Sequence, residues 1–140
     1  IAGVATGGIA IGALVAQDLG LPFAYVRSSG KRHGLGNKVE GVVESGQSVI
    51  VIEDLISTGR SSLSAVEALR EKQCEVKGMV AIFSYAFQQA EIAFKEAGCQ
   101  LHTLSNYPTL ISVAADNDYI VKDDIESLSG WRKSPETWGI

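Results

Sequence analysis

Short runs rich in β-branched residues alternate along this chain with longer stretches whose apolar residues recur at helical spacing. The strand-like runs occupy residues 1–5, 23–27, 39–43, 48–52, 76–83 and 101–104. The helix-like stretches occupy residues 9–19, 61–72, 86–97, 110–115 and 118–128. Strands that alternate with helices in this way favour a mostly parallel sheet flanked by helices. We therefore predict an α/β fold in which residues 1–140 form a single domain.

The composition fits one globular core and narrows the range of partners. The chain has 140 residues, of which 46% are hydrophobic and 20% charged, and its formal net charge is −4. An acidic chain argues against a nonspecific nucleic-acid binder and against a cationic membrane-surface protein. The apolar run at residues 1–16 ends at Gln17, short of the ~20 residues that a membrane-spanning helix needs. Cys74 and Cys99 stand outside any CxxC pattern, so we expect buried thiols and a cytoplasmic location.

The stretch VIVIEDLISTGRSS, residues 49–62, joins a strand, two acids, a turn and the start of a helix. In an open parallel sheet, ligands bind at the carboxyl ends of the strands. A turn over residues 57–61 exposes backbone N–H groups at the positive end of the helix dipole, and Gly59 lets a ligand approach the backbone. This order predicts a phosphate site, although neither GxxxxGK[ST] nor GxGxxG occurs in the chain.

Glu53 and Asp54 lie directly before this turn. Carboxylates repel a phosphate, but they accept hydrogen bonds from sugar hydroxyls and stabilise a neighbouring cationic centre. The combination predicts a holder for a sugar 5-phosphate, with the acids facing the sugar. The alternative is a solvated strand end followed by an ordinary helix N-cap.

EDLISTGRS resembles the 5-phosphoribosyl-1-diphosphate (PRPP) motif of the type I phosphoribosyltransferases, which have a Rossmann-like core. The resemblance implies that PRPP contacts Glu53, Asp54, Leu55, Ile56, Ser57, Thr58, Gly59, Arg60 and Ser61. The position of Ser57 also touches orotate in some relatives. The family uses Mg²⁺, and the resemblance implies that the ion is held mainly through PRPP, with no direct protein ligand.

Residues 24–41, AYVRSSGKRHGLGNKVEG, resemble the catalytic loop of the orotate phosphoribosyltransferases. The resemblance implies that Arg27, Lys31 and His33 bind PRPP and, with Asp54, take part in catalysis. Cations there would stabilise the negative charge that builds on the departing pyrophosphate. The resemblance also implies a homodimer in which loop 28–38 reaches the partner's site.

Two further segments extend the resemblance over the chain. Residues 3–12, GVATGGIAIG, are similar to the loop that faces pyrophosphate, which assigns Thr6, Gly7 and Gly8 to that role. The tail WRKSPETW resembles one bacterial branch of the orotate enzymes. The family's N-terminal portion, which helps to bind the pyrimidine, has no counterpart in this sequence, which begins with Ile. We therefore expect that portion to be absent from the chain.

Three positions depart from the family pattern. Ser28 stands where some members carry a second lysine, and Arg60 replaces a small residue in the phosphate turn. Residues 84–86 offer no arginine for the orotate carboxylate, which some members supply there. The carboxylate partner must therefore come from elsewhere.

The expected function is transfer of the 5-phosphoribosyl group from PRPP to orotate, giving orotidine 5′-monophosphate and pyrophosphate in pyrimidine biosynthesis. One alternative is a phosphoribosyltransferase for a purine or for uracil, against which the loop with Arg27, Lys31 and His33 argues. The other is a non-catalytic PRPP-binding regulator. The retained cations and the acidic net charge argue against it, since such regulators tend to lose the cations and gain a nucleic-acid surface. We expect PRPP and orotate as partners, with no nucleic acid and no membrane.

Overall fold

The computed structural model describes residues 1–27 and 38–138, and within them a six-stranded sheet has the order β3-β2-β1-β4-β5-β6. The strands are β1 (Ala2–Val4), β2 (Ala24–Val26), β3 (Val39–Glu40), β4 (Ser48–Ile56), β5 (Glu75–Ser84) and β6 (Leu101–Asn106). The helices are α1 (Gly7–Leu19), α2 (Arg60–Glu71), α3 (Gln88–Glu96), α4 (Tyr107–Asp116) and α5 (Lys122–Lys133). Only the pairing of β2 with β3 is antiparallel among these strands.

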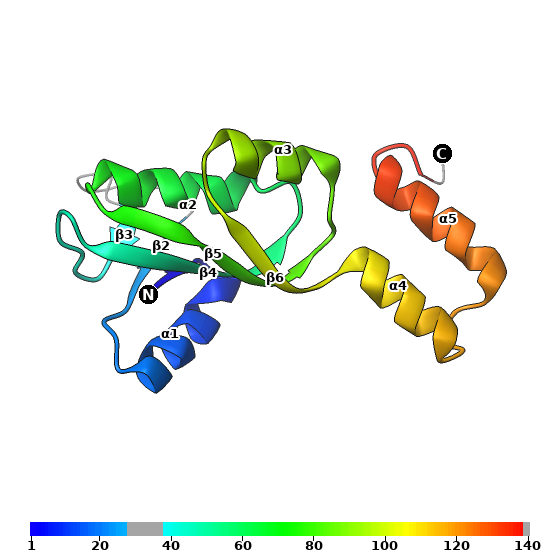
Figure 1. The fold of residues 1–140 in the computed structure, drawn as a ribbon, viewed down its shortest axis with the longest axis horizontal. Coiled ribbons are helices and arrows are strands. Elements are labelled where there is room, and N and C mark those ends of the chain that lie inside the picture. The colour runs from blue at the N-terminus through cyan, green and yellow to red at the C-terminus, as the bar shows by residue number, and fades with distance from the viewer. Residues whose placement is uncertain (28–37, 139–140) are drawn as a thin grey trace.

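The sheet carries helices on both of its faces. Helices α2 and α3 cover one face and α1 covers the other, while α4 and α5 extend beyond the end of the sheet (Figure 1). The prediction of an α/β fold with a mostly parallel, helix-flanked sheet is confirmed. Within the described residues, no helix combines the length and the apolar character needed to cross a membrane.

The core lies between the central strands and α2. Val51 of β4 and Met79 of β5 are fully buried, and Val66 and Leu69 of α2 pack against them in the same cluster. The helical spacing of Leu63, Val66 and Leu69 in the sequence predicts one apolar face, and Leu63 is half-buried at the edge of the cluster. Burial of these apolar side chains is the main force that fixes α2 on the sheet.

Strand β4 is longer than its apolar run indicated. It continues to Ile56, because Glu53 pairs with Ala81, and Ile56 with Ser84, in the parallel ladder with β5. The two acids therefore lie within the strand rather than after it. Strand β3 is shorter than the predicted 39–43 and ends before Gly41, whose φ is +105°.

The C-terminal helices are joined to the sheet by aromatic packing. Trp131 of α5 lies 4.9 Å from Tyr107 and 5.3 Å from Tyr85, measured between ring centroids. Arg132 Nη1 donates a 2.8 Å hydrogen bond to the carbonyl of Ala86, in the loop after β5. These contacts explain why α5 continues to Lys133, through residues that the sequence had indicated as a polar tail.

Candidate active site

The strand order reverses direction between β1 and β4. The chain leaves β1 toward β2 and β3 on one side, and the remaining strands add on the other side, beginning with β4. Helix α1 follows β1 on one face and α2 follows β4 on the opposite face (Figure 1). Ligands of open α/β sheets bind at such a switch point, outside the carboxyl ends of the strands.

At this point the turn after β1 packs tightly against β4. A Cβ atom on Gly7 would lie 1.9 Å from Oδ2 of Asp54, and one on Gly8 would lie 2.5 Å from the carbonyl oxygen of Ile52. The peptide bond between Ala5 and Thr6 is cis. Thr6, Gly7 and Asp54 are all exposed to solvent. Gly7, in the segment predicted to face pyrophosphate, therefore lies beside Asp54 on an accessible surface, whereas Gly8 of the same segment is buried.

The turn after β4 leads directly into α2. Gly59 precedes the helix with φ +79°, and a Cβ atom there would lie 2.9 Å from the ring of Phe94. Ser57, Thr58 and Ser61 are exposed. The first N–H groups of a helix lack partners within it, and the dipole makes that end positive. The exposed bend at residues 57–58 and the first turn of α2, which begins at Arg60 rather than at Ser61, therefore form a candidate anion site.

Glu53 departs from its expected orientation toward a sugar. Its side chain is buried, with 4% of the residue's surface exposed. Oε2 accepts a 2.8 Å hydrogen bond from Ser62 Oγ, and Oε1 accepts one of 3.1 Å from the backbone N–H of Asp54. Burial, reinforced by the Asp54 carboxyl, raises the pKa of Glu53 to about 7, although both hydrogen-bond donors oppose the shift. The carboxyl of Glu53 faces α2, and Asp54 is the exposed acid of the pair.

Arg27 follows β2 at the same end of the sheet. Its Nη1 lies 3.4 Å from Oε1 of Glu40, and its backbone N–H donates to the carbonyl of Lys38 at 2.8 Å. This pairing holds the start of the predicted catalytic loop against β3. The other two predicted cations of that loop, Lys31 and His33, lie outside the described residues, as does Ser28.

Comparison with known proteins decides the family. Residues 1–107 match the family model described as the phosphoribosyl transferase domain. The chain belongs to the phosphoribosyltransferase family. It is 58% identical over 140 residues to the orotate phosphoribosyltransferase of Porphyromonas gingivalis, covering 100% of this chain and 67% of that protein. It is 54% identical over 138 residues to the enzyme of the same name from Cytophaga hutchinsonii, covering 99% of this chain and 66% of that protein.

A solved phosphoribosyltransferase structure agrees with the fold. The orotate phosphoribosyltransferase of Aeropyrum pernix superposes with a TM-score of 0.70 and 28% sequence identity, covering 81% of this chain and 62% of that one. The resemblance drawn from the sequence motifs is thereby confirmed. The chain spans about two thirds of the length of the curated relatives that it matches.

Three contacts in and around this candidate site were not predicted from the sequence. Ser62 binds Glu53, the backbone N–H of Tyr85 donates to the carbonyl of Ile56 at 3.0 Å, and Arg132 reaches the loop after β5. The sequence did contain a signal for the burial of Ser62, since it precedes the buried residues Ala65 and Val66 by three and four positions and so lies on the same face of α2. Arg132 had no local signal, because its contact joins segments far apart in sequence.

Proposed function

We propose that this chain is the PRPP-binding core of an enzyme that transfers the 5-phosphoribosyl group from PRPP to orotate. The observation that carries the proposal is the contact between Gly7 and Asp54, which brings two segments of the family pattern together at the switch point. The name shared by the most similar relatives supports orotate as the acceptor.

The 5-phosphate would bind to the turn at residues 57–61. Its oxygens would accept hydrogen bonds from the N–H groups at the start of α2 and from the exposed hydroxyls of Ser57, Thr58 and Ser61. Leu55, Ile56, Gly59 and Arg60 complete the proposed contact segment. Asp54 would accept a hydrogen bond from a ribose hydroxyl. Ser57, next to the strand end, would also touch orotate.

The reaction joins N1 of orotate to C1 of the ribose while the bond from C1 to the diphosphate oxygen breaks, and the proton on N1 is released. Positive charge develops on the ribose and negative charge on the leaving group. Asp54 would stabilise the former, and Arg27, Lys31 and His33 would stabilise the latter, beside Thr6, Gly7 and Gly8. Pairing with Glu40 holds the Arg27 side chain at the end of β2.

Mg²⁺ is the proposed cofactor, and it would neutralise diphosphate charge when bound. In the described part of the chain, no group of three or more His, Cys, Asp or Glu side chains could hold a metal ion. We propose that the ion is held mainly through PRPP oxygens. We also propose a homodimer in which loop 28–38 reaches the partner's site. A cytoplasmic location accords with the buried, free thiols of Cys74 and Cys99.

The assay is pyrophosphate release from Mg²⁺-PRPP by the full-length protein, with orotate, uracil, adenine and hypoxanthine offered in parallel. We expect release with orotate alone. Pyrophosphate release with another base but not with orotate would show that the other base is the acceptor. Binding of PRPP without release with any base would favour the regulator over the enzyme.

A further inference from the structure

A hydrogen bond between two buried polar side chains connects the two halves of the proposed PRPP site. Ser62 has 1% of its surface exposed and Glu53 has 4%, and their side-chain oxygens lie 2.8 Å apart. Glu53 is covalently joined to Asp54, and Ser62 is joined to Ser61 at the end of the phosphate turn. The bond therefore ties β4 to the first turn of α2.

The direction of the Ser62 hydroxyl distinguishes this contact from helix capping. A serine in the first turn of a helix commonly bonds with nearby backbone groups of its own segment. Ser62 instead donates across the turn to Glu53, nine residues earlier. Because the other Glu53 oxygen accepts the N–H of Asp54, the carboxyl cannot turn toward a ligand without losing both bonds. Glu53 is held as part of the framework.

The other neighbours of Glu53 offer no competing charged partner among the described residues. Ala81 of β5 stands opposite it in the ladder, and the first turn of α1 carries no charged side chain. Of the titratable groups around it, Asp54 is exposed beside it, and Arg60 is exposed at the start of α2. The Ser62 hydroxyl is thus the side-chain donor that orients Glu53.

We propose that Ser62 is a positioning residue for PRPP: by holding Glu53, it fixes the spacing between Asp54 and the phosphate turn. This inference rests on the proposed function. One ligand must satisfy both places at once, its ribose at Asp54 and its 5-phosphate at residues 57–61. A site already held at the right spacing binds without the cost of ordering its two halves.

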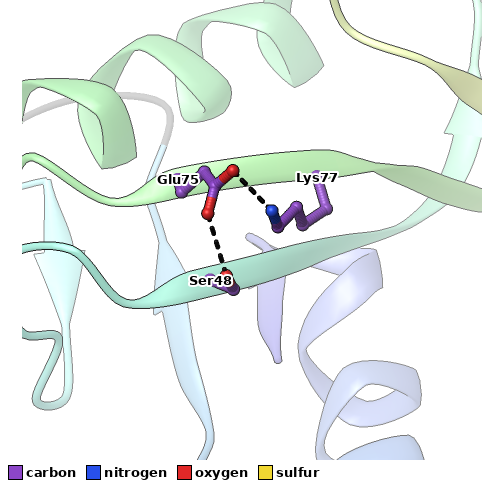
Figure 2. Close-up of polar contacts among 3 residues, drawn as sticks. All are labelled: Ser48, Glu75 and Lys77. Atoms are coloured by element: carbon purple, nitrogen blue, oxygen red, sulfur yellow. Dashed lines mark hydrogen bonds and ion pairs between the residues drawn. The ribbon is translucent and has the colours of Figure 1, made fainter.

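The test compares Ser62→Ala with Ser48→Ala in the full-length protein. Ser48 lies at the other end of β4, where its Oγ donates a 3.1 Å hydrogen bond to Glu75, which also pairs with Lys77 (Figure 2). Each variant loses one serine–glutamate hydrogen bond that involves a residue of β4, but only the bond of Ser62 is buried and lies at the proposed site. Affinity for Mg²⁺-PRPP is measured by calorimetry, and KM and kcat by pyrophosphate release.

We expect Ser62→Ala to raise Kd and KM for PRPP about ten-fold, the scale of one hydrogen bond to a charged group. The kcat at saturating PRPP should change little, and Ser48→Ala should match the parent. A purely structural role is distinguished by the pH profile of PRPP affinity. If the orientation of Glu53 matters to PRPP, affinity should change as Glu53 titrates near pH 7, and loss of the Ser62 donor, which lowers that pKa, should move the change to higher pH. A general loss of packing would weaken binding equally at every pH.

PRPP affinity equal to that of the Ser48→Ala control, or a loss that is uniform with pH, would overturn the role of Ser62. If Ser62→Ala does not fold, Ser62→Cys serves instead, since its thiol is a weak donor. We then expect a smaller rise in Kd and KM for PRPP, and a PRPP affinity equal to that of the parent protein would overturn the inference. If the parent protein binds no PRPP, the proposed function is overturned together with the inference. If the parent protein binds PRPP and Ser62→Ala binds it equally well, only the inference is overturned.

Discussion

The carboxylate of Asp54 occupies the space that a side chain on Gly7 would need, since a Cβ there would lie 1.9 Å from Oδ2. Helix α1 begins at Gly7, and Asp54 lies within β4, so the contact joins two elements that are separated by 47 positions in the chain. A glycine at position 7 is thus a condition for the acid to stand at the switch point.

Gly7→Ala should displace Asp54 or the start of α1. The carboxylate is the end of an exposed, flexible side chain, so it can move aside at little cost in stability. We expect PRPP affinity to fall, because the acid moves. The control is Gly130→Ala, where a Cβ would meet nothing within 4 Å and helix propensity favours alanine. Equal PRPP affinities for both variants would contradict the role of this contact.

Asp54→Asn should weaken PRPP binding or turnover while leaving the fold intact. The exposed carboxylate is proposed to accept a ribose hydroxyl, and a charge-assisted hydrogen bond contributes about 1.5–3 kcal/mol, or roughly ten-fold to a hundred-fold. Steady-state kinetics against PRPP would measure the change. Asp18→Asn, on an exposed position near the other end of α1, is the matched control. Unchanged kinetics in Asp54→Asn would show that the acid serves the structure alone.

Gly59→Ala should destabilise the protein more than Gly46→Ala does. Both glycines have φ +79°, so each substitution carries the strain of a left-handed backbone, about 1–2 kcal/mol. At position 59 a Cβ would also stand 2.9 Å from the Phe94 ring, whereas at position 46 it would meet nothing within 4 Å. Denaturant unfolding of both variants isolates the contact with Phe94. Equal losses of unfolding free energy in the two variants would show that the Phe94 ring moves aside at no cost.

Glu53→Gln should change how stability depends on pH. Burial raises the pKa of Glu53 to about 7 in the folded protein, from an ordinary value of 4.5. The stability contributed by the neutral acid is fully present below about pH 4.5 and is lost as pH rises through about 7. The loss is at most a few kcal/mol, at about 1.4 kcal/mol per pKa unit. Denaturant unfolding across this range should show a shallower fall in the glutamine variant.

Glu75→Gln is the control for that measurement. Lys77 and Ser48 lower the pKa of this exposed carboxyl, so its contribution has the opposite sign and is lost as pH falls. The same pH profile for the parent protein and Glu53→Gln would contradict the raised pKa of Glu53.

Lys31→Ala should reduce turnover by orders of magnitude while PRPP binding stays largely intact. The residue lies outside the described part of the chain, so this prediction comes from its place in the catalytic-loop pattern. The charge that it would meet develops late, on the departing pyrophosphate, and loss of such a contact lowers kcat rather than raising KM. Single-turnover kinetics with orotate provide the measurement. Parent-like turnover would remove Lys31 from catalysis.

Local patterns in the sequence predicted the parallel α/β fold, the buried face of α2 and a turn between β4 and α2, although α2 begins at Arg60 rather than at Ser61. Each of these predictions depends on a pattern among residues that are close in the chain, such as helical periodicity or a glycine before a helix. The extent of β4 was not predictable in this way. Glu53 is polar, and only pairing with β5 keeps it in the strand.

The sequence by itself determined that two acids come just before the turn proposed to bind phosphate, because the order of residues along the chain is fixed by covalent bonds. Only the tertiary structure decided that the acids have different environments. Glu53 turns inward to Ser62 of α2, and Asp54 stays exposed beside Gly7 of α1. Neighbouring side chains on a strand point to opposite faces, and what each face meets depends on helices that pack there from elsewhere in the chain.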